Sequence, residues 1–171
     1  MKRVILSLTA VAVVAVVFTA CKPELTLDEM LTNKKGWKLV EATSAPAYEL
    51  SNGSKINSLF DGYLEAWELD DILFFKEDGA LTIDPGKVLP PEGKSGWTTA
   101  KTIGTWAWQD DTTKIRMQIP FWYPATEGGV REPDVLNKNF LDKETLKLSL
   151  TFTEDETGER YTFALTYTAV K

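Results

Sequence analysis

The second half of the chain alternates apolar and polar residues with a period of two, and this pattern restricts the fold more than any other feature. Apolar side chains recur at every second position in residues 104–108, 115–119, 146–152 and 161–167. Successive side chains of a β-strand point to opposite faces, so each of these segments predicts a strand with one apolar face. One apolar and one polar face is typical of an antiparallel sheet that covers a core on one side. The pattern therefore predicts an all-β fold.

Four more strands are expected from shorter signals. Residues 71–76 and 80–84 flank Asp78-Gly79, and Asp-Gly is a strong hairpin turn. Residues 36–41 and 135–141 also have strand character, which brings the number of strands to eight. Eight antiparallel strands fit a sandwich or a barrel, and a closed barrel of this size has room for side chains or one small ligand. We expect an eight-stranded antiparallel up-and-down β-barrel.

Two short helices are expected beside the barrel. Thr26 and Glu29 have the spacing of a capping box, which predicts a helix over residues 26–33. Residues 56–68 place apolar side chains three and four positions apart, which predicts an amphipathic helix that could cover one end of the barrel. The polar residues 43–55, which include Pro46, are expected to form a loop.

The N-terminal residues have the pattern of an export signal. Lys2 and Arg3 precede the apolar run 4–18, which is shorter than the about 20 residues that a membrane-spanning helix needs. Small residues then precede Cys21, the single cysteine of the chain. A cysteine with no possible disulfide partner at this position suits lipidation, although an ordinary secreted protein with a free thiol at Cys21 is the alternative.

Several motifs resemble known proteins. Residues 18–21, Phe-Thr-Ala-Cys, resemble the bacterial lipobox, and residues 35–39, 70–79 and 104–106 resemble the lipocalin-like domains of Bacteroidetes lipoproteins. The two closing strand segments fit the same layout. The resemblance implies a calycin-type barrel, lipid attachment at Cys21 and, because Lys22 follows the cysteine, an outer-membrane location on the periplasmic side or the cell surface. It implies no particular ligand.

These signals divide the chain into three parts. Residues 1–20 are expected to be a lipoprotein signal peptide, residues 21–30 a lipidated tether that runs into the N-terminal helix, and residues 31–171 the lipocalin-like barrel.

Composition excludes several functional classes. The net charge of −6 disfavours nucleic acid as a partner, and the absence of histidine excludes Ser-His and Cys-His nucleophiles. Acidic residues cluster at 70–71, 77–78, 110–111 and 154–156, which could suit glycoside hydrolysis or calcium binding. All these clusters fall where turns are expected, so we interpret them as solvated. The sequence thus predicts no enzyme, no cofactor and no metal.

Aromatic and apolar residues provide the candidate binding sites. The side chains expected to line the barrel interior, where they would bind an apolar molecule or simply fill the core, are Trp37, Phe74, Trp106, Trp108, Met117, Leu148 and Phe163. The aromatic residues of the two long loops are Trp97, Phe121, Trp122 and Tyr123. These loop residues would contact a glycan or a protein, or cap the barrel mouth.

The sequence therefore predicts a membrane-anchored lipoprotein with a non-catalytic binding role, its ligand being a small apolar or amphipathic molecule in the barrel. Two alternatives remain open at this point. One is a surface module that contacts glycan or protein through exposed aromatic loops. The other is a structural accessory subunit of an envelope complex, with a filled barrel.

Overall fold

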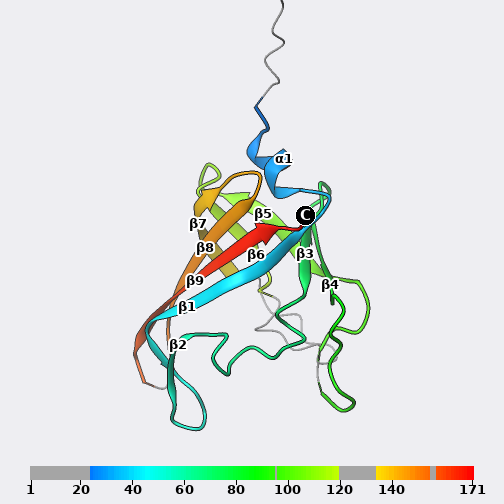
Figure 1. Cartoon of the computed structure of the whole chain (residues 1–171). Helices are drawn as coiled ribbons and strands as arrows, with labels where there is room; N and C mark the ends of the chain where they lie inside the picture. The colour runs from blue at the N-terminus through cyan, green and yellow to red at the C-terminus, as the bar shows by residue number, and fades with distance from the viewer. Residues whose placement is uncertain (1–23, 95, 120–133, 155–156) are drawn as a thin grey trace, which may run out of the picture.

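The fold is an antiparallel β-barrel, and the described residues include one short helix at one end of it (Figure 1). The computed structural model describes residues 24–94, 96–119, 134–154 and 157–171. The elements are α1 (Leu27–Leu31), β1 (Trp37–Glu49), β2 (Lys55–Ser58), β3 (Ile72–Phe75), β4 (Ala80–Asp84), β5 (Lys101–Gln109), β6 (Lys114–Met117), β7 (Asp134–Leu141), β8 (Thr145–Thr153) and β9 (Arg160–Ala169). No helix among the described residues is long and apolar enough to cross a membrane.

The barrel closes between its first and last strands. Strands β3 to β9 pair each with the next, and β1 pairs with both β3 and β9, so eight strands form a closed antiparallel ring. Strand β2 pairs only with β1 and lies outside the ring. This arrangement confirms the predicted eight-stranded up-and-down barrel and adds one strand to it.

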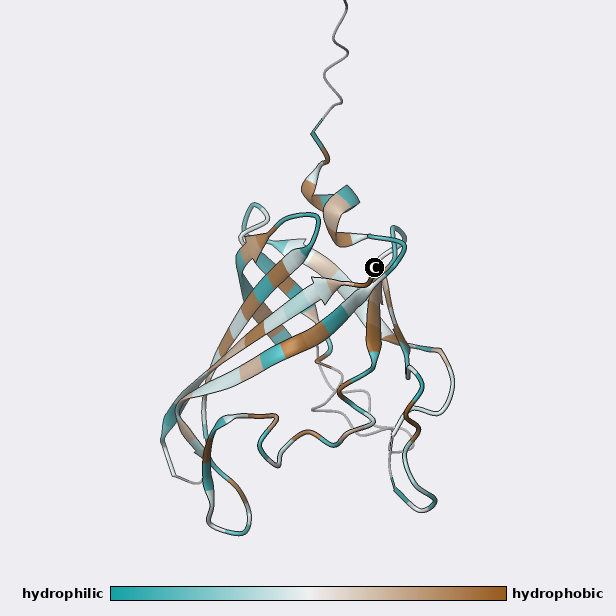
Figure 2. Ribbon diagram, viewed as in Figure 1, coloured by the Kyte–Doolittle hydropathy of each residue, from teal (hydrophilic) through white to brown (hydrophobic). Residues whose placement is uncertain are grey.

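The hydropathy of the strands follows the expected alternation (Figure 2). In β9, every second residue from Tyr161 to Tyr167 is buried, and in β6 the buried residues are Ile115 and Met117. Burying one apolar row per strand gives the barrel a single core, because every strand contributes its inward row to the same interior.

The two ends of the barrel differ. The helix end carries α1 and the short turns after β3, β5 and β7, and the loop end carries the long segments 59–71 and 85–100 (Figure 1). The chain enters at the helix end, where the first described residues precede α1. The last described residue, Lys171, follows β9 at the same end.

Helix α1 packs against the helix end of the barrel. The predicted capping box is present: the Glu29 backbone N–H donates to the Thr26 hydroxyl at 3.2 Å, and the Thr26 N–H donates to the Glu29 carboxylate at 2.7 Å. Leu31 is fully buried, and its carbonyl accepts a hydrogen bond of 2.7 Å from the indole of Trp37. The indole of Trp108 donates to Asp28 of the same helix. Two strands therefore hold α1 in place.

The predicted helix over residues 56–68 is wrong. Residues 55–58 form β2, in which Ile56 pairs with Tyr48 of β1, and turns follow up to residue 70. Leu59 and Leu64 are buried, five positions apart, because successive turns direct each of them into the core. In this segment, a strand followed by turns places apolar residues three and four positions apart. Periodicity alone does not distinguish this arrangement from a short helix.

The predicted loop over residues 43–55 is also wrong in its first half, because β1 continues to Glu49. Ala42 to Ala45 pair with β9, and Tyr48 and Glu49 pair with β2. Pro46 follows the last pair with β9, and the register of β1 against β2 shifts between Thr43 and Tyr48, where Pro46 has no N–H to donate.

The wall of the barrel opens where β1 leaves β3. Only two residue pairs join these strands, Trp37 with Leu73 and Lys38 with Ile72, and beyond them β1 pairs with β9 and, further along, with β2. The loop-end segment 59–71 crosses this side of the barrel before it enters β3 (Figure 1). The divergence of β1 and β3 leaves space for a pocket beneath that segment.

Candidate functional site

The barrel interior is filled by most of the side chains that the sequence placed there. Met117 and Leu148 are fully buried, and Phe163 and Trp106 are nearly so. The Trp106 ring packs edge-on against Phe75 and Trp108, with centroid separations of 5.6 and 5.9 Å, and its indole donates to the Lys76 carbonyl. Trp37 and the half-buried Trp108 belong to the same apolar cluster. In this structure, these six side chains form core.

Phe74 is not an interior residue, contrary to the prediction. Its neighbours Leu73 and Phe75 are buried, whereas Phe74 is half-buried on the other face of β3, with the Lys76 ammonium 4.7 Å from its ring centre. All four residues from Ile72 to Phe75 are apolar, so the sequence does not show which alternate pair points inward.

A small pocket lies where β1 and β3 diverge, between these strands and the two long segments of the loop end. Its free volume is about 30 Å³, which is enough for one or two water molecules. The pocket is lined by apolar side chains from three strands, by two carboxylates, by a tyrosine and by two indoles: Leu39, Leu73, Ile83, Glu68, Asp71, Tyr167, Trp37 and Trp97. We call this site the end pocket.

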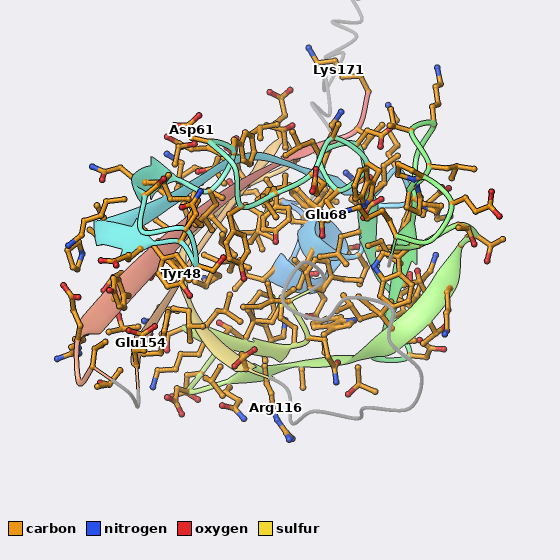
Figure 3. All side chains as sticks on the ribbon, turned by 90° about the horizontal axis from the view of Figure 1, so that it is seen from below. Tyr48, Asp61, Glu68, Arg116, Glu154 and Lys171 are labelled. Carbon is orange, nitrogen blue, oxygen red and sulfur yellow. The ribbon has the colours of Figure 1, made fainter. Side chains whose placement is uncertain are left out.

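The carboxylates of the end pocket come from the last turns of segment 59–71. Glu68 lies over the middle of the loop end, whereas Asp61, Arg116 and Glu154 lie at its periphery (Figure 3). One Glu68 oxygen accepts a hydrogen bond of 2.8 Å from the Glu65 N–H, which fixes the local turn. Partial burial raises the pKa of the Glu68 carboxyl above its usual value.

Asp71 is the most perturbed carboxyl of the site. Burial is the main cause that raises its pKa from the ordinary value of 3.8 to about 7, and the negative charges of Asp70, Glu68 and Asp84 supply the rest of that shift. No described basic side chain forms an ion pair with any of these four carboxylates. Near neutral pH, the Asp71 carboxyl is therefore divided between its protonated and ionised forms.

Asp70 connects the two long segments of the loop end. One of its carboxylate oxygens accepts hydrogen bonds from the backbone N–H groups of Lys87 and Val88, at 2.7 and 3.0 Å. Its other oxygen is buried and has no hydrogen-bond partner among the described residues. Because Asp70 directly precedes Asp71, these bonds also fix the position of the pocket carboxylate.

Tyr167 supplies a buried hydroxyl to the same site. Its side chain is 3% exposed, and within the described part of the chain its hydroxyl has no hydrogen-bond partner. Burial alone raises the pKa of this phenol, so it stays protonated at physiological pH. Leaving a buried polar group unpaired costs about 1–3 kcal/mol, and such groups in native proteins call for an explanation.

The loop aromatics and the anchor are only partly covered by the structure. Trp97 is half-buried at the end pocket, and the Lys101 ammonium lies 5.6 Å from its ring centre. Phe121, Trp122, Tyr123 and Cys21 lie outside the described residues, so their predicted roles stay predictions.

The acidic pairs divide into two kinds. Asp78 accepts from the Ala80 N–H in a turn, and Asp110 pairs with Lys114 on the surface, as expected of solvated turns. The interpretation of Asp70-Asp71 as a solvated turn is wrong, because both carboxylates are partly or wholly covered. Glu68, Asp71 and Tyr167 were missed as site residues. Asp71 had a signal in its acidic pair with Asp70, and Tyr167 had one in its place in the inward row of the last strand, whereas Glu68 had none.

Known proteins offer no further guidance on this site. No protein-family model matches the chain, and no curated protein matches it at a significant level. Within residues 24–94, 96–119, 134–154 and 157–171, no group of three or more acidic, cysteine or histidine side chains could hold a metal ion.

The raised pKa of Asp71 predicts a specific pH dependence of stability. Between about pH 4 and pH 7 the folded protein keeps the Asp71 proton while the unfolded chain releases it, so the free energy of unfolding falls as the pH rises. Asp71→Asn should remove this decrease and stabilise the protein at pH 8, because asparagine carries no charge to bury. The expected gain is only about 1–2 kcal/mol, since solvent screens the partly exposed carboxylate. Urea denaturation at pH 5 and pH 8 measures the difference. Asp61→Asn, on the same segment but exposed, should behave like the unsubstituted protein.

Substitution of Gly86 tests the close contact between this residue and Asp70. A Cβ at Gly86 would lie 2.5 Å from the Asp70 carbonyl oxygen, whereas a Cβ at Gly53 would meet nothing within 4 Å, and both residues have positive φ. Each alanine substitution should cost about 1–2 kcal/mol of conformational energy. Gly86→Ala should cost about 1–3 kcal/mol more, because the Asp70 backbone must move. Equal losses of unfolding free energy in the two variants would contradict this contact.

Proposed function

We propose that this chain is a lipid-anchored binding protein of the outer membrane that holds a small amphipathic molecule, or the polar end of a larger one, in the end pocket. The binding is non-catalytic. The observation that carries the proposal is the composition of the pocket, in which apolar walls surround the unpartnered Tyr167 hydroxyl and two carboxylates. Ligand sites typically combine mostly apolar lining with a few convergent polar groups.

The position of the pocket suits an anchored protein. Glu24, the described residue nearest to Cys21, precedes α1 at the helix end, whereas Glu68, Asp71 and Trp97 of the end pocket come from the two loop-end segments. With a lipid on Cys21, α1 would lie next to the membrane and the loop end would point away from it. A ligand would then reach the pocket from the aqueous side.

A probe-uptake experiment tests this function. An amphipathic fluorescent probe with a small polar end, titrated into residues 22–171, should bind saturably, and Ile83→Trp, which fills one wall of the pocket, should reduce binding by at least about tenfold. Val135→Trp is the matched control, because Val135 is an exposed residue of β7 outside the pocket. Absence of saturable uptake by the unsubstituted protein would contradict a binding role.

A second candidate is a structural accessory subunit of an envelope complex. The packed core favours it, because buried side chains fill the described part of the barrel interior and the end pocket has a free volume of only about 30 Å³. Mass spectrometry of the native protein separates the two functions. A co-purifying small molecule would support the binding role, and a stoichiometric envelope protein without a small molecule would support the accessory role.

A further inference from the structure

We propose that the end pocket recognises a protonated amine, that is, an ammonium group attached to a small apolar body. This inference rests on the binding function proposed above and specifies the class of ligand. It is drawn from the polar groups that line the pocket, from the absence of a described counterion and from the character of the walls.

The charge of the pocket favours a cation. Glu68 and Asp71 line it, Asp70 and Asp84 stand close enough to act on Asp71, and no described lysine or arginine pairs with any of them. A partly buried carboxylate without a counterion is costly, so a cation that enters the pocket removes a penalty already present in the free protein. A carboxylate or phosphate ligand would add to that penalty.

The Tyr167 hydroxyl makes the site more than an acidic cluster. It is buried, it lines the same pocket and it has no hydrogen-bond partner among the described residues. An ammonium group has three N–H donors. The carboxylates of Glu68 and Asp71 and the oxygen of Tyr167 are three acceptors that could receive them, so one small group could donate to all three.

The walls fit the rest of such a ligand. Leu39, Leu73 and Ile83 offer apolar contact, and the indoles of Trp37 and Trp97 add aromatic surface, to which cations are attracted. The free volume of about 30 Å³ suits a primary ammonium better than a bulky quaternary one. An amine whose carbon body extends towards the loop end would use both parts of the lining.

Proton release provides a signature of this chemistry. A bound ammonium would favour the ionised form of Asp71, whose carboxyl titrates near pH 7 in the free protein. Burial, together with the charges of Asp70, Glu68 and Asp84, keeps this carboxyl partly protonated, and the Tyr167 phenol does not titrate in this range. Amine binding should therefore release protons at pH 7 and strengthen between pH 6 and pH 8.

The test compares three probes of the same length that differ in charge: n-butylammonium, 1-butanol and butyrate. Calorimetric titration into the full chain, purified in detergent, should show butylammonium binding at least about tenfold more tightly than butanol, and no binding of butyrate. Buffers of different ionisation enthalpy report the proton release. Glu68→Gln and Asp71→Asn should each reduce the preference for the amine by about tenfold, and Tyr167→Phe should weaken amine binding by about fivefold.

Asp61→Asn is the control, since it removes an exposed carboxylate from the same segment and should leave binding unchanged. The outcomes separate the two proposals. Equal binding of butanol or butyrate would overturn the amine inference and leave the binding function standing, whereas saturable binding of none of the three probes would overturn both. If Asp71→Asn does not fold, Glu68→Gln and the pH dependence of the unsubstituted protein decide the question.

Discussion

Trp37→Ala should reduce the free energy of unfolding by about 3–5 kcal/mol, which is the usual cost of deleting a fully buried aromatic side chain. Trp37 is 0% exposed, it lies at the seam where β1 meets both β3 and β9, and its indole N–H donates to the Leu31 carbonyl of α1. Domains of this size have total stabilities of about 5–15 kcal/mol, so the variant could lose a large part of its stability. Urea denaturation followed by tryptophan fluorescence or circular dichroism measures the loss.

Two further variants resolve the contributions of Trp37. Trp37→Phe keeps a large apolar ring and removes the indole donor, so it should cost less, about 1–3 kcal/mol, and loosen α1. Val40→Ala, on the same strand but 43% exposed, should change stability by less than about 0.5 kcal/mol. If Trp37→Ala costs no more than Val40→Ala, the packing at the seam is not what stabilises the barrel.

Cys21→Ser should move nearly all of the protein from the membrane fraction to the soluble fraction and abolish the incorporation of labelled fatty acid. Each buried CH₂ of an acyl chain contributes about 0.8 kcal/mol to membrane binding, so several chains on one cysteine hold a protein firmly and their loss releases it. Sedimentation of cell membranes, together with fatty-acid labelling of the immunoprecipitated protein, measures both effects.

The matched control for the anchor is Lys22→Arg, which preserves the charge next to the cysteine and should leave labelling and sedimentation unchanged. A Cys21→Ser protein that still incorporates fatty acid would show that another residue is modified. One that remains in the membrane fraction without a label would indicate that the apolar run 4–18 or a protein partner retains it.

The closed barrel could be predicted because each of its strands carries its own local signal. Alternation in 146–152 and 161–167 fixed the inward rows of β8 and β9, and Asp78-Gly79 fixed the hairpin between β3 and β4. The cap of α1 was equally local, since Thr26 and Glu29 are three residues apart and bond to each other. Such features depend on neighbours in the chain and need no knowledge of the rest of the fold.

The predictions failed where distant segments decide the structure. Beyond Lys38, β1 no longer pairs with β3, and its free edge pairs with residues 55–58. These residues are therefore a strand, although the spacing of their apolar side chains suggested a helix. Phe74 faces outward because the register of β3 against β1 and β4 points Leu73 and Phe75 into the core. Tertiary pairing overrides local spacing in both cases.

The sequence by itself determined that this protein is an antiparallel barrel with a capped N-terminal helix, since period-two patterning and capping chemistry act over a few residues. Only the tertiary structure decided where its candidate site lies. Glu68 and Asp71 precede β3, Tyr167 is near the end of β9, and they meet because β1 parts from β3 and leaves a pocket between them. The burial that leaves these carboxylates and this hydroxyl available to a ligand comes from pocket residues that are far apart in the sequence. No local pattern records that burial.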